Sequence, residues 1–220
     1  MKKIYFPDID LKKVKGVLID LDDTLYPFDA PEAAALKATY RKRKKLLGVS
    51  FEDFLNEYHT EWDRRFDLLG RVPSAHHRFM IFLHMLEKRK VSHAYALAAD
   101  MHNAFFKTVC DHMKPDKKAL CFLKECHRRK IPVCVVTDLF AMIQIQKLKA
   151  LKMMRYVDFI VSNDEVGADK PCPLMFKTAL KKMGIRAKDA IMVGDNSSKD
   201  IAGAADLGIK TYQVLPAPQK

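Results

Sequence analysis

The chain has 220 residues, of which 49% are hydrophobic and 30% charged, and its formal net charge is +12. This length and composition allow a substantial buried core and exclude disorder over most of the chain. No stretch reaches the roughly 20 apolar residues of a membrane helix, and the N-terminus lacks a long apolar signal core. We therefore expect a cytoplasmic protein without a membrane partner, whose positive charge favours anionic ligands.

The five cysteines indicate neither a disulfide framework nor a zinc site. Their number is odd, their spacing is irregular and no Cys-x-x-Cys pair occurs. We interpret them as buried or incidental thiols.

Short apolar segments rich in β-branched residues recur along the chain and predict buried strands. Segments with helical periodicity separate the later ones, and the last of these helices is closed by Gly208. This alternation predicts an α/β fold with a doubly wound parallel sheet. The expected strands are 14–20, 131–137, 159–162, 190–194 and 210–214, and the expected helices of this part are 117–129, 140–149, 173–183 and 197–207.

A long stretch after the first strand, residues 27–113, contains no convincing strand and many helix formers. Crossover connections in such sheets are usually one helix long, so this stretch requires a separate explanation. We predict an inserted helical domain over 27–113 that acts as a lid, and a core formed by 1–26 and 114–220. Its expected helices are 32–47, 51–69, 74–89 and 92–110.

Polar side chains lie where the predicted strands end. Asp20 and Asp22 follow the first strand, Thr137 ends the second, and Asp195 follows the fourth. Ligands of open parallel sheets bind beyond the carboxyl ends of the strands, so these groups are expected to share one crevice with Lys170. Close carboxylates resist joint ionisation without a cation, and oxygen ligands alone favour Mg²⁺.

The order and spacing of these residues resemble the four motifs of the haloacid dehalogenase superfamily. The matching segments are Asp20-Leu21-Asp22-Asp23-Thr24-Leu25, then Thr137, then Lys170-Pro171-Cys172-Pro173, then Gly194-Asp195-Asn196-Ser197-Ser198-Lys199-Asp200. The insertion after the first strand is similar to that superfamily's helical cap. The resemblance implies an Mg²⁺-dependent phosphatase acting on a small phosphorylated metabolite.

The resemblance also implies a role for each acid of the first motif. Asp20 is the expected nucleophile, which forms an aspartyl-phosphate. Asp22 is the expected acid and base, protonated before attack because other carboxylates lie beside it. An acid at position 22 argues against dehalogenation and against a long-lived phosphoenzyme, and it leaves a phosphatase or a phosphomutase.

The remaining positions of the motifs are expected to bind phosphate or metal. Thr24, Thr137 and Lys170 would hold phosphoryl oxygens, and Asp138 lies beside them. The expected metal ligands are Asp20, Asp195 and the backbone carbonyl of Asp22, with Asn196 and Asp200 in support. Asp200 would orient Lys170 or a metal-bound water, although its spacing from Ser197 equally fits a capping box.

Asp138 departs from the superfamily pattern, which has Asn after the Ser or Thr of the second motif. A carboxylate aimed at phosphate would repel it, so we expect the Asp138 side chain to turn away and cap the helix that starts near residue 140.

Several alternatives stay open. A phosphomutase would use the same residues. A non-catalytic protein could bind nucleic acid through the basic run at residues 41–45, although a solvated helix face explains that run better. For the substrate, the sequence favours a nucleoside monophosphate only slightly over a sugar phosphate.

Overall fold

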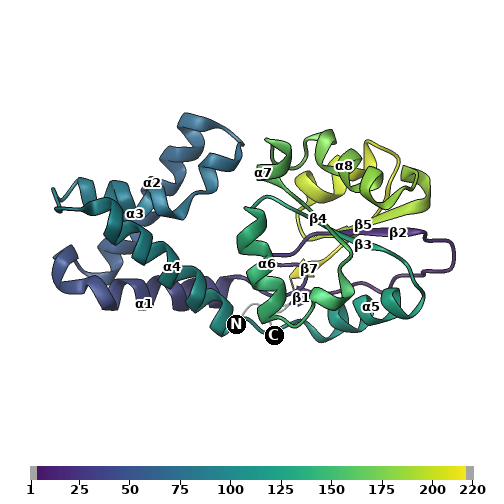
Figure 1. Cartoon of the computed structure of the whole chain (residues 1–220), viewed down its shortest axis with the longest axis horizontal. Helices are drawn as coiled ribbons and strands as arrows, with labels where there is room; N and C mark the ends of the chain where they lie inside the picture. Colours follow the sequence, from purple (N-terminus) through teal and green to yellow (C-terminus); the bar gives the residue numbers. More distant parts are fainter. Residues whose placement is uncertain (1–3, 217–220) are drawn as a thin grey trace. The chain divides into compact units, whose positions relative to one another are not determined.

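The computed structural model describes residues 4–216. The chain divides into two compact units, one spanning Met1–Phe28 and Met113–Lys220 and the other spanning Asp29–His112 (Figure 1). Within the described residues, segments from both the N-terminal and the C-terminal part of the chain therefore contribute to the first unit.

The first unit contains a five-stranded sheet in the order β4-β3-β2-β5-β6, in which all neighbours are parallel. The first strand of the sheet along the chain, β2, lies at its centre, so the strand order reverses there. This is the doubly wound arrangement predicted from the sequence. The strands are β2 (Gly16–Ile19), β3 (Val133–Thr137), β4 (Phe159–Ser162), β5 (Ala190–Gly194) and β6 (Lys210–Gln213).

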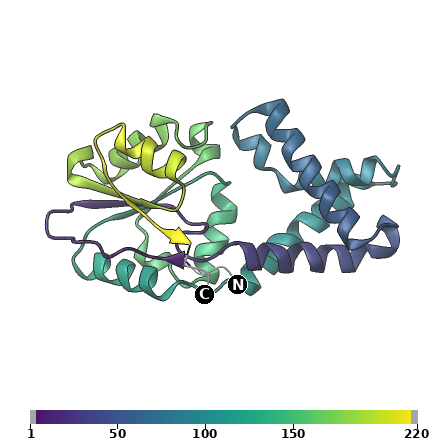
Figure 2. The same ribbon diagram turned by 180° about the vertical axis from the view of Figure 1, so that it is seen from behind.

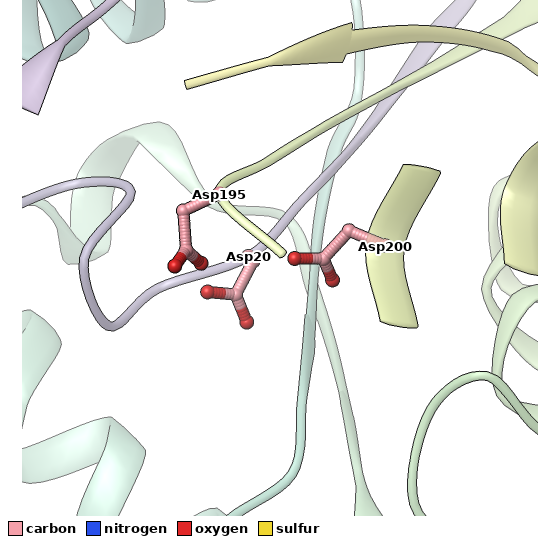
Figure 3. Close-up of side chains that lie close together, drawn as sticks. All are labelled: Asp20, Asp195 and Asp200. Carbon is pink, nitrogen blue, oxygen red and sulfur yellow. The ribbon is translucent and has the colours of Figure 1, made fainter. Parts of the chain in front are cut away.

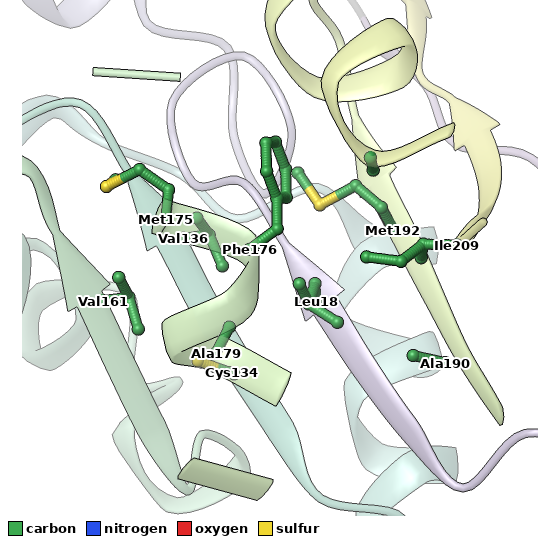
Figure 4. Close-up of a cluster of buried hydrophobic side chains, with 11 residues drawn as sticks. Leu18, Cys134, Val136, Val161, Met175, Phe176, Ala179, Ala190, Met192 and Ile209 are labelled. Carbon is green, nitrogen blue, oxygen red and sulfur yellow. The ribbon is translucent and has the colours of Figure 1, made fainter. Parts of the chain in front are cut away.

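Helices α5 (Lys117–Arg128) and α8 (Pro173–Met183) lie on opposite sides of the sheet (Figure 1). Asp116 starts α5 by accepting a hydrogen bond from the Ala119 backbone N–H at 2.9 Å. Proline opens α8, and Gly184, with φ of +66°, ends it in the left-handed conformation. On the α8 side, Phe176 packs with Leu18 and Met192 of the sheet in a fully buried cluster (Figure 4).

Two features of this unit differ from the sequence prediction. The expected helix at 197–207 is a π-helical turn at Ser197–Ala202 followed by α9 (Gly203–Ala205). A short antiparallel ladder also joins β1 (Ile4–Tyr5) to β7 (Leu215–Pro216), near the two ends of the described chain (Figure 2). Such short strands carry no periodicity from which they could be predicted. The smaller elements are α6 (Ala141–Ala150), α7 (Asn163–Val166) and the 3₁₀ turns Met154–Tyr156 and Ala187–Asp189.

The second unit is helical, and in it α4 packs against both α1 and α3. Ser50 caps α2 by accepting from the Asp53 backbone N–H at 3.1 Å. The single helix expected at 74–89 is interrupted at His77, which adopts an extended conformation. The elements are α1 (Asp29–Leu47), α2 (Phe51–Leu69), a 3₁₀ turn (Pro73–His76), α3 (Arg78–Glu87) and α4 (Ala94–His112). Within residues 4–216, none of the helices combines the length and apolarity that crossing a membrane requires.

Candidate active site

Three carboxylates meet at the carboxyl ends of the two central strands. Ile19 of β2 pairs with Val193 of β5, and the Asp20 backbone N–H continues the pairing by donating to the Val193 carbonyl at 2.9 Å. Asp20 and Asp195 therefore leave neighbouring strand ends together. The π-helical turn returns Asp200 to the same place, and one oxygen from each carboxylate lies within 4.8 Å of the others (Figure 3).

Lys170 supplies a positive charge to this cluster. Its Nζ donates to Asp20 Oδ1 at 2.5 Å, to Asp200 Oδ1 at 2.7 Å and to the Val136 carbonyl at 2.9 Å. The lysine is buried, so all of its ammonium donors are directed by the protein rather than by bulk water. Thr24 Oγ1 donates to the other Asp20 oxygen at 3.3 Å, which fixes the plane of that carboxylate.

The cluster contains more negative than positive charge. Burial, helped by the charges of Asp200 and Asp195, raises the pKa of Asp20 well above its usual value despite Lys170. Burial, with the charges of Asp200 and Asp23, raises the pKa of Asp195 to about 6. An all-oxygen donor set with uncompensated negative charge fits a hard divalent cation such as Mg²⁺.

The sequence comparison identifies the family. Residues 14–208 match the family model of haloacid dehalogenase-like hydrolases. The chain belongs to this family. It is 32% identical to a ribulose-1,5-bisphosphate 5-phosphatase of Halopiger xanaduensis, over 93% of this chain and 86% of the relative. It is 27% identical to a glyceraldehyde 3-phosphate phosphatase of Methanopyrus kandleri, over 91% of this chain and 84% of the relative.

Solved structures show the same fold. A 2-haloacid dehalogenase of Pseudomonas syringae superposes with a TM-score of 0.75 at 23% identity, covering 91% of this chain and 86% of that one. A haloacid dehalogenase-like phosphatase of Thermococcus onnurineus gives a TM-score of 0.67 at 21% identity, with 91% and 86% covered. With phosphatases among its sequence relatives, this hydrolase is an enzyme of the phosphatase type.

Asp22 of this hydrolase faces a different environment from the three clustered carboxylates. Its two oxygens accept from Lys147 Nζ at 2.7 and 2.8 Å, and they also accept from the Tyr26 hydroxyl and, at 3.2 Å, from Gln144 Nε2. Burial alone would raise the pKa of Asp22, but the Lys147 charge and these hydrogen bonds outweigh burial, so the pKa is lowered. The lowered pKa differs from the raised pKa that we expected, because the neighbours of the Asp22 carboxylate are Lys147, Tyr26 and Gln144 rather than other carboxylates.

Thr137 ends β3 and is buried. Its Oγ1 accepts from Gln144 Nε2 at 2.5 Å, so its own hydroxyl hydrogen is left to donate elsewhere. The same Gln144 amide nitrogen thus contacts both Thr137 and Asp22.

Asp138 does turn away, but not to cap a helix. Its Oδ1 accepts from the Lys170 backbone N–H at 2.7 Å and its Oδ2 from Lys199 Nζ at 2.9 Å. The first amide of α6, Ala141, instead donates to Asp164 at 3.1 Å. The capping prediction is therefore wrong, because the Lys170 backbone and the Lys199 side chain each offer Asp138 a donor.

Asn196 and Asp200 organise the π-helical turn. Asn196 Oδ1 accepts from the backbone N–H of Ser198 at 3.1 Å and of Lys199 at 2.9 Å, so Asn196 and not Ser197 is the N-cap. Asp200 Oδ2 accepts from the Asn196 backbone N–H at 3.0 Å while its Oδ1 accepts from Lys170. Asp200 therefore contacts Lys170 and also accepts from the N-cap amide, although the N-cap is Asn196 and not the Ser197 of the expected capping box.

The sequence reasoning missed Tyr26, Gln144 and Lys147 around Asp22. One signal for the last two was available, because Gln144 and Lys147 share a helical face with apolar Ile143 and Leu148. Polar residues within the apolar stripe of a helix need partners when they are buried.

Proposed function

We propose that this enzyme hydrolyses a phosphomonoester of a small sugar-type metabolite, with Asp20 as the nucleophile. The observation that carries the proposal is the approach of Lys170 Nζ to Asp20 Oδ1, at 2.5 Å, within a cluster of excess carboxylates. A buried ammonium beside a carboxylate offers a site for phosphoryl oxygens next to an attacking group.

The reaction proceeds in two displacements. A carboxylate oxygen of Asp20 forms a bond to phosphorus as the ester P–O bond breaks. Asp22, whose pKa is lowered in the free enzyme, takes up the proton of the monoanionic phosphomonoester and gives it to the leaving oxygen. Water then attacks the aspartyl-phosphate and gives its proton to Asp22. Phosphate takes that proton as it leaves, and the Asp20 carboxylate is restored. The sum is one ester and one water converted to one alcohol and one phosphate.

Other groups hold the phosphoryl oxygens during both displacements. The Thr137 hydroxyl hydrogen, left available by Gln144, and the Lys170 ammonium are suited to donate to them. Asp138 supports Lys170 by accepting from its backbone N–H. Thr24 acts on the nucleophile itself, since it donates to the second oxygen of Asp20.

Magnesium fits this donor set, with Asp20 and Asp195 as side-chain ligands, the Asp22 backbone carbonyl as a further one and Asp200 in support. When bound, it would neutralise negative charge on the phosphoryl group.

The substrate class rests on the relatives. The Halopiger and Methanopyrus phosphatases are named for ribulose-1,5-bisphosphate and for glyceraldehyde 3-phosphate. Both compounds are small phosphorylated sugars, which favours sugar phosphates over the nucleoside monophosphate that the sequence put first. We assign substrate selection to the helical unit, Asp29–His112, as a cap.

Phosphate release from a panel of sugar phosphates and nucleoside monophosphates, with Mg²⁺ or with a chelator, tests the proposal. We expect release from sugar phosphates that requires Mg²⁺ and falls at least about 10³-fold in Asp20→Asn. Isomerised sugar phosphate without free phosphate would instead indicate a phosphomutase. Activity retained in Asp20→Asn would refute the assignment of the nucleophile.

A further inference from the structure

Lys147 is a charged residue on the buried face of α6, the helix that follows β3. It lies in the middle of α6, its side chain is fully buried, and its Nζ lies 4.9 Å from the centre of the Phe28 ring. A buried ammonium is costly unless it is paired. Here the pairing group is Asp22, the residue to which the proposed function gives proton transfer.

Three side chains converge on the Asp22 carboxylate, and we call Tyr26, Gln144 and Lys147 the Asp22 holder. Lys147 contacts both oxygens, Tyr26 donates to Oδ1 and Gln144 donates to Oδ2. Because both oxygens are engaged from different directions, rotation of the carboxylate would break several hydrogen bonds at once.

The local sequence explains this convergence. Gln144 and Lys147 are three residues apart on α6, so they lie on one face of the helix, one above the other. Tyr26 reaches the same carboxylate from its own loop, four residues after Asp22. Gln144 also donates to Thr137, which links the holder to a residue proposed to bind phosphate.

We propose that Lys147 is a positioning residue that, with Gln144 and Tyr26, keeps the Asp22 carboxylate in place to take a proton from the water that hydrolyses the aspartyl-phosphate. The inference rests on the proposed function and deepens it. In that step a water O–H bond breaks, its proton goes to Asp22, the oxygen bonds to phosphorus and the Asp20–phosphorus bond breaks. Lys147 contacts no reacting atom and acts through Asp22.

The experiment separates the two displacements with 4-nitrophenyl phosphate in the presence of Mg²⁺. Nitrophenolate leaves with little help from an acid, so kcat/KM reports formation of the phosphoenzyme without strong dependence on Asp22. In Lys147→Met we expect kcat and KM to fall together, about 10- to 100-fold, while kcat/KM changes by less than about threefold. Rapid mixing is expected to show a burst of nitrophenolate that approaches one equivalent.

The matched control is Lys149→Met, the same substitution at an exposed lysine of the same helix, which is expected to leave all three constants unchanged. Tyr26→Phe removes one hydroxyl from the Asp22 holder and keeps the ring. If Lys147→Met does not fold, this variant tests whether the holder positions Asp22. For Tyr26→Phe we expect the same pattern with a fall of about 2- to 5-fold.

Asp22→Asn provides the reference that separates this inference from the proposed function. It is expected to accumulate phosphoenzyme, and adding Lys147→Met to it is expected to slow breakdown less than about twofold further. Normal breakdown in Asp22→Asn would overturn the role of Asp22 itself. Slow breakdown in Asp22→Asn, with no burst and a lowered kcat/KM in a folded Lys147→Met, would leave Lys147 a structural ion-pair partner and overturn the inference alone.

Discussion

Each unit of the molecule contains a buried carboxylate with charged neighbours, but the two groups have opposite charge balance. In the sheet unit, Asp20, Asp195 and Asp200 lie together and Lys170 contacts two of them, Asp20 and Asp200, so negative charge is in excess. In the helical unit, the fully buried Glu61 contacts Lys88 and Arg64, so positive charge is in excess.

The pKa directions follow this balance. Burial would raise the pKa of Glu61, but hydrogen bonds from Lys88 and Arg64 outweigh burial and lower it. In the sheet unit Lys170 does not outweigh burial and repulsion, and the pKa values of Asp20 and Asp195 are raised. Burial of a carboxylate alone therefore does not identify a functional site. The excess of like charge does, because it leaves a place for a cation.

Removing Lys170 is expected to have the largest effect, because it leaves the carboxylates of the sheet unit without their ammonium. In Lys170→Met, with a chelator present, we expect a loss of about 3–5 kcal/mol in the free energy of unfolding and no detectable phosphate release. Urea unfolding measures the first and a phosphate assay the second. The control Lys182→Met removes a partly exposed lysine paired with Glu165 and is expected to cost less than about 1 kcal/mol. Equal losses of unfolding free energy in Lys170→Met and Lys182→Met would show that the carboxylates around Lys170 do not depend on its charge.

The position of Asp200 can be changed without changing its charge. A Cβ added at Gly194 would lie 2.5 Å from Asp200 Cγ, so Gly194→Ala is expected to displace that carboxylate from Lys170. We expect kcat/KM for phosphate release to fall about 10- to 100-fold. In Gly16→Ala, at the start of the neighbouring strand β2, the nearest atom is the flexible end of Ile185, and activity is expected to stay within about twofold. Full activity in Gly194→Ala would show that the site tolerates a displaced Asp200.

The smallest effect is expected in the helical unit. Glu61→Gln leaves Lys88 and Arg64 without their carboxylate, but about half of each of these side chains is exposed to water, which screens them. We expect a loss of about 1–2 kcal/mol in unfolding free energy, and phosphate release well below the unfolding temperature that remains within about threefold. Thermal unfolding and the phosphate assay measure both. A complete loss of activity in the folded variant would place Glu61 in the catalytic machinery and contradict the comparison.

The sequence predicted the strands and the acids at their ends because both follow from local pattern. Apolar runs specify buried strands, and parallel strands bring their carboxyl ends to one edge, so the meeting of Asp20 and Asp195 could be predicted without coordinates. The helix bounds at 173–183 and 51–69 agree with the structure for the same reason.

Contacts between residues that are far apart in the sequence could not be predicted from local patterns. Lys147 lies 125 residues from Asp22, and nothing local to either residue specifies their contact. The expectations for Asp22 and Asp138 share this cause, since neither included the partner that the structure provides from far along the chain, Lys147 for Asp22 and Lys170 for Asp138. The break at His77 also has no strong local signal.

Calorimetric titration with Mg²⁺ tests the central claim most directly, namely that the excess carboxylates of the sheet unit form a cation site. We predict that the wild type and Glu61→Gln bind Mg²⁺ alike, and that Asp195→Asn binds it at least about 10-fold more weakly. Undiminished binding by Asp195→Asn, or no binding by the wild type, would contradict the account.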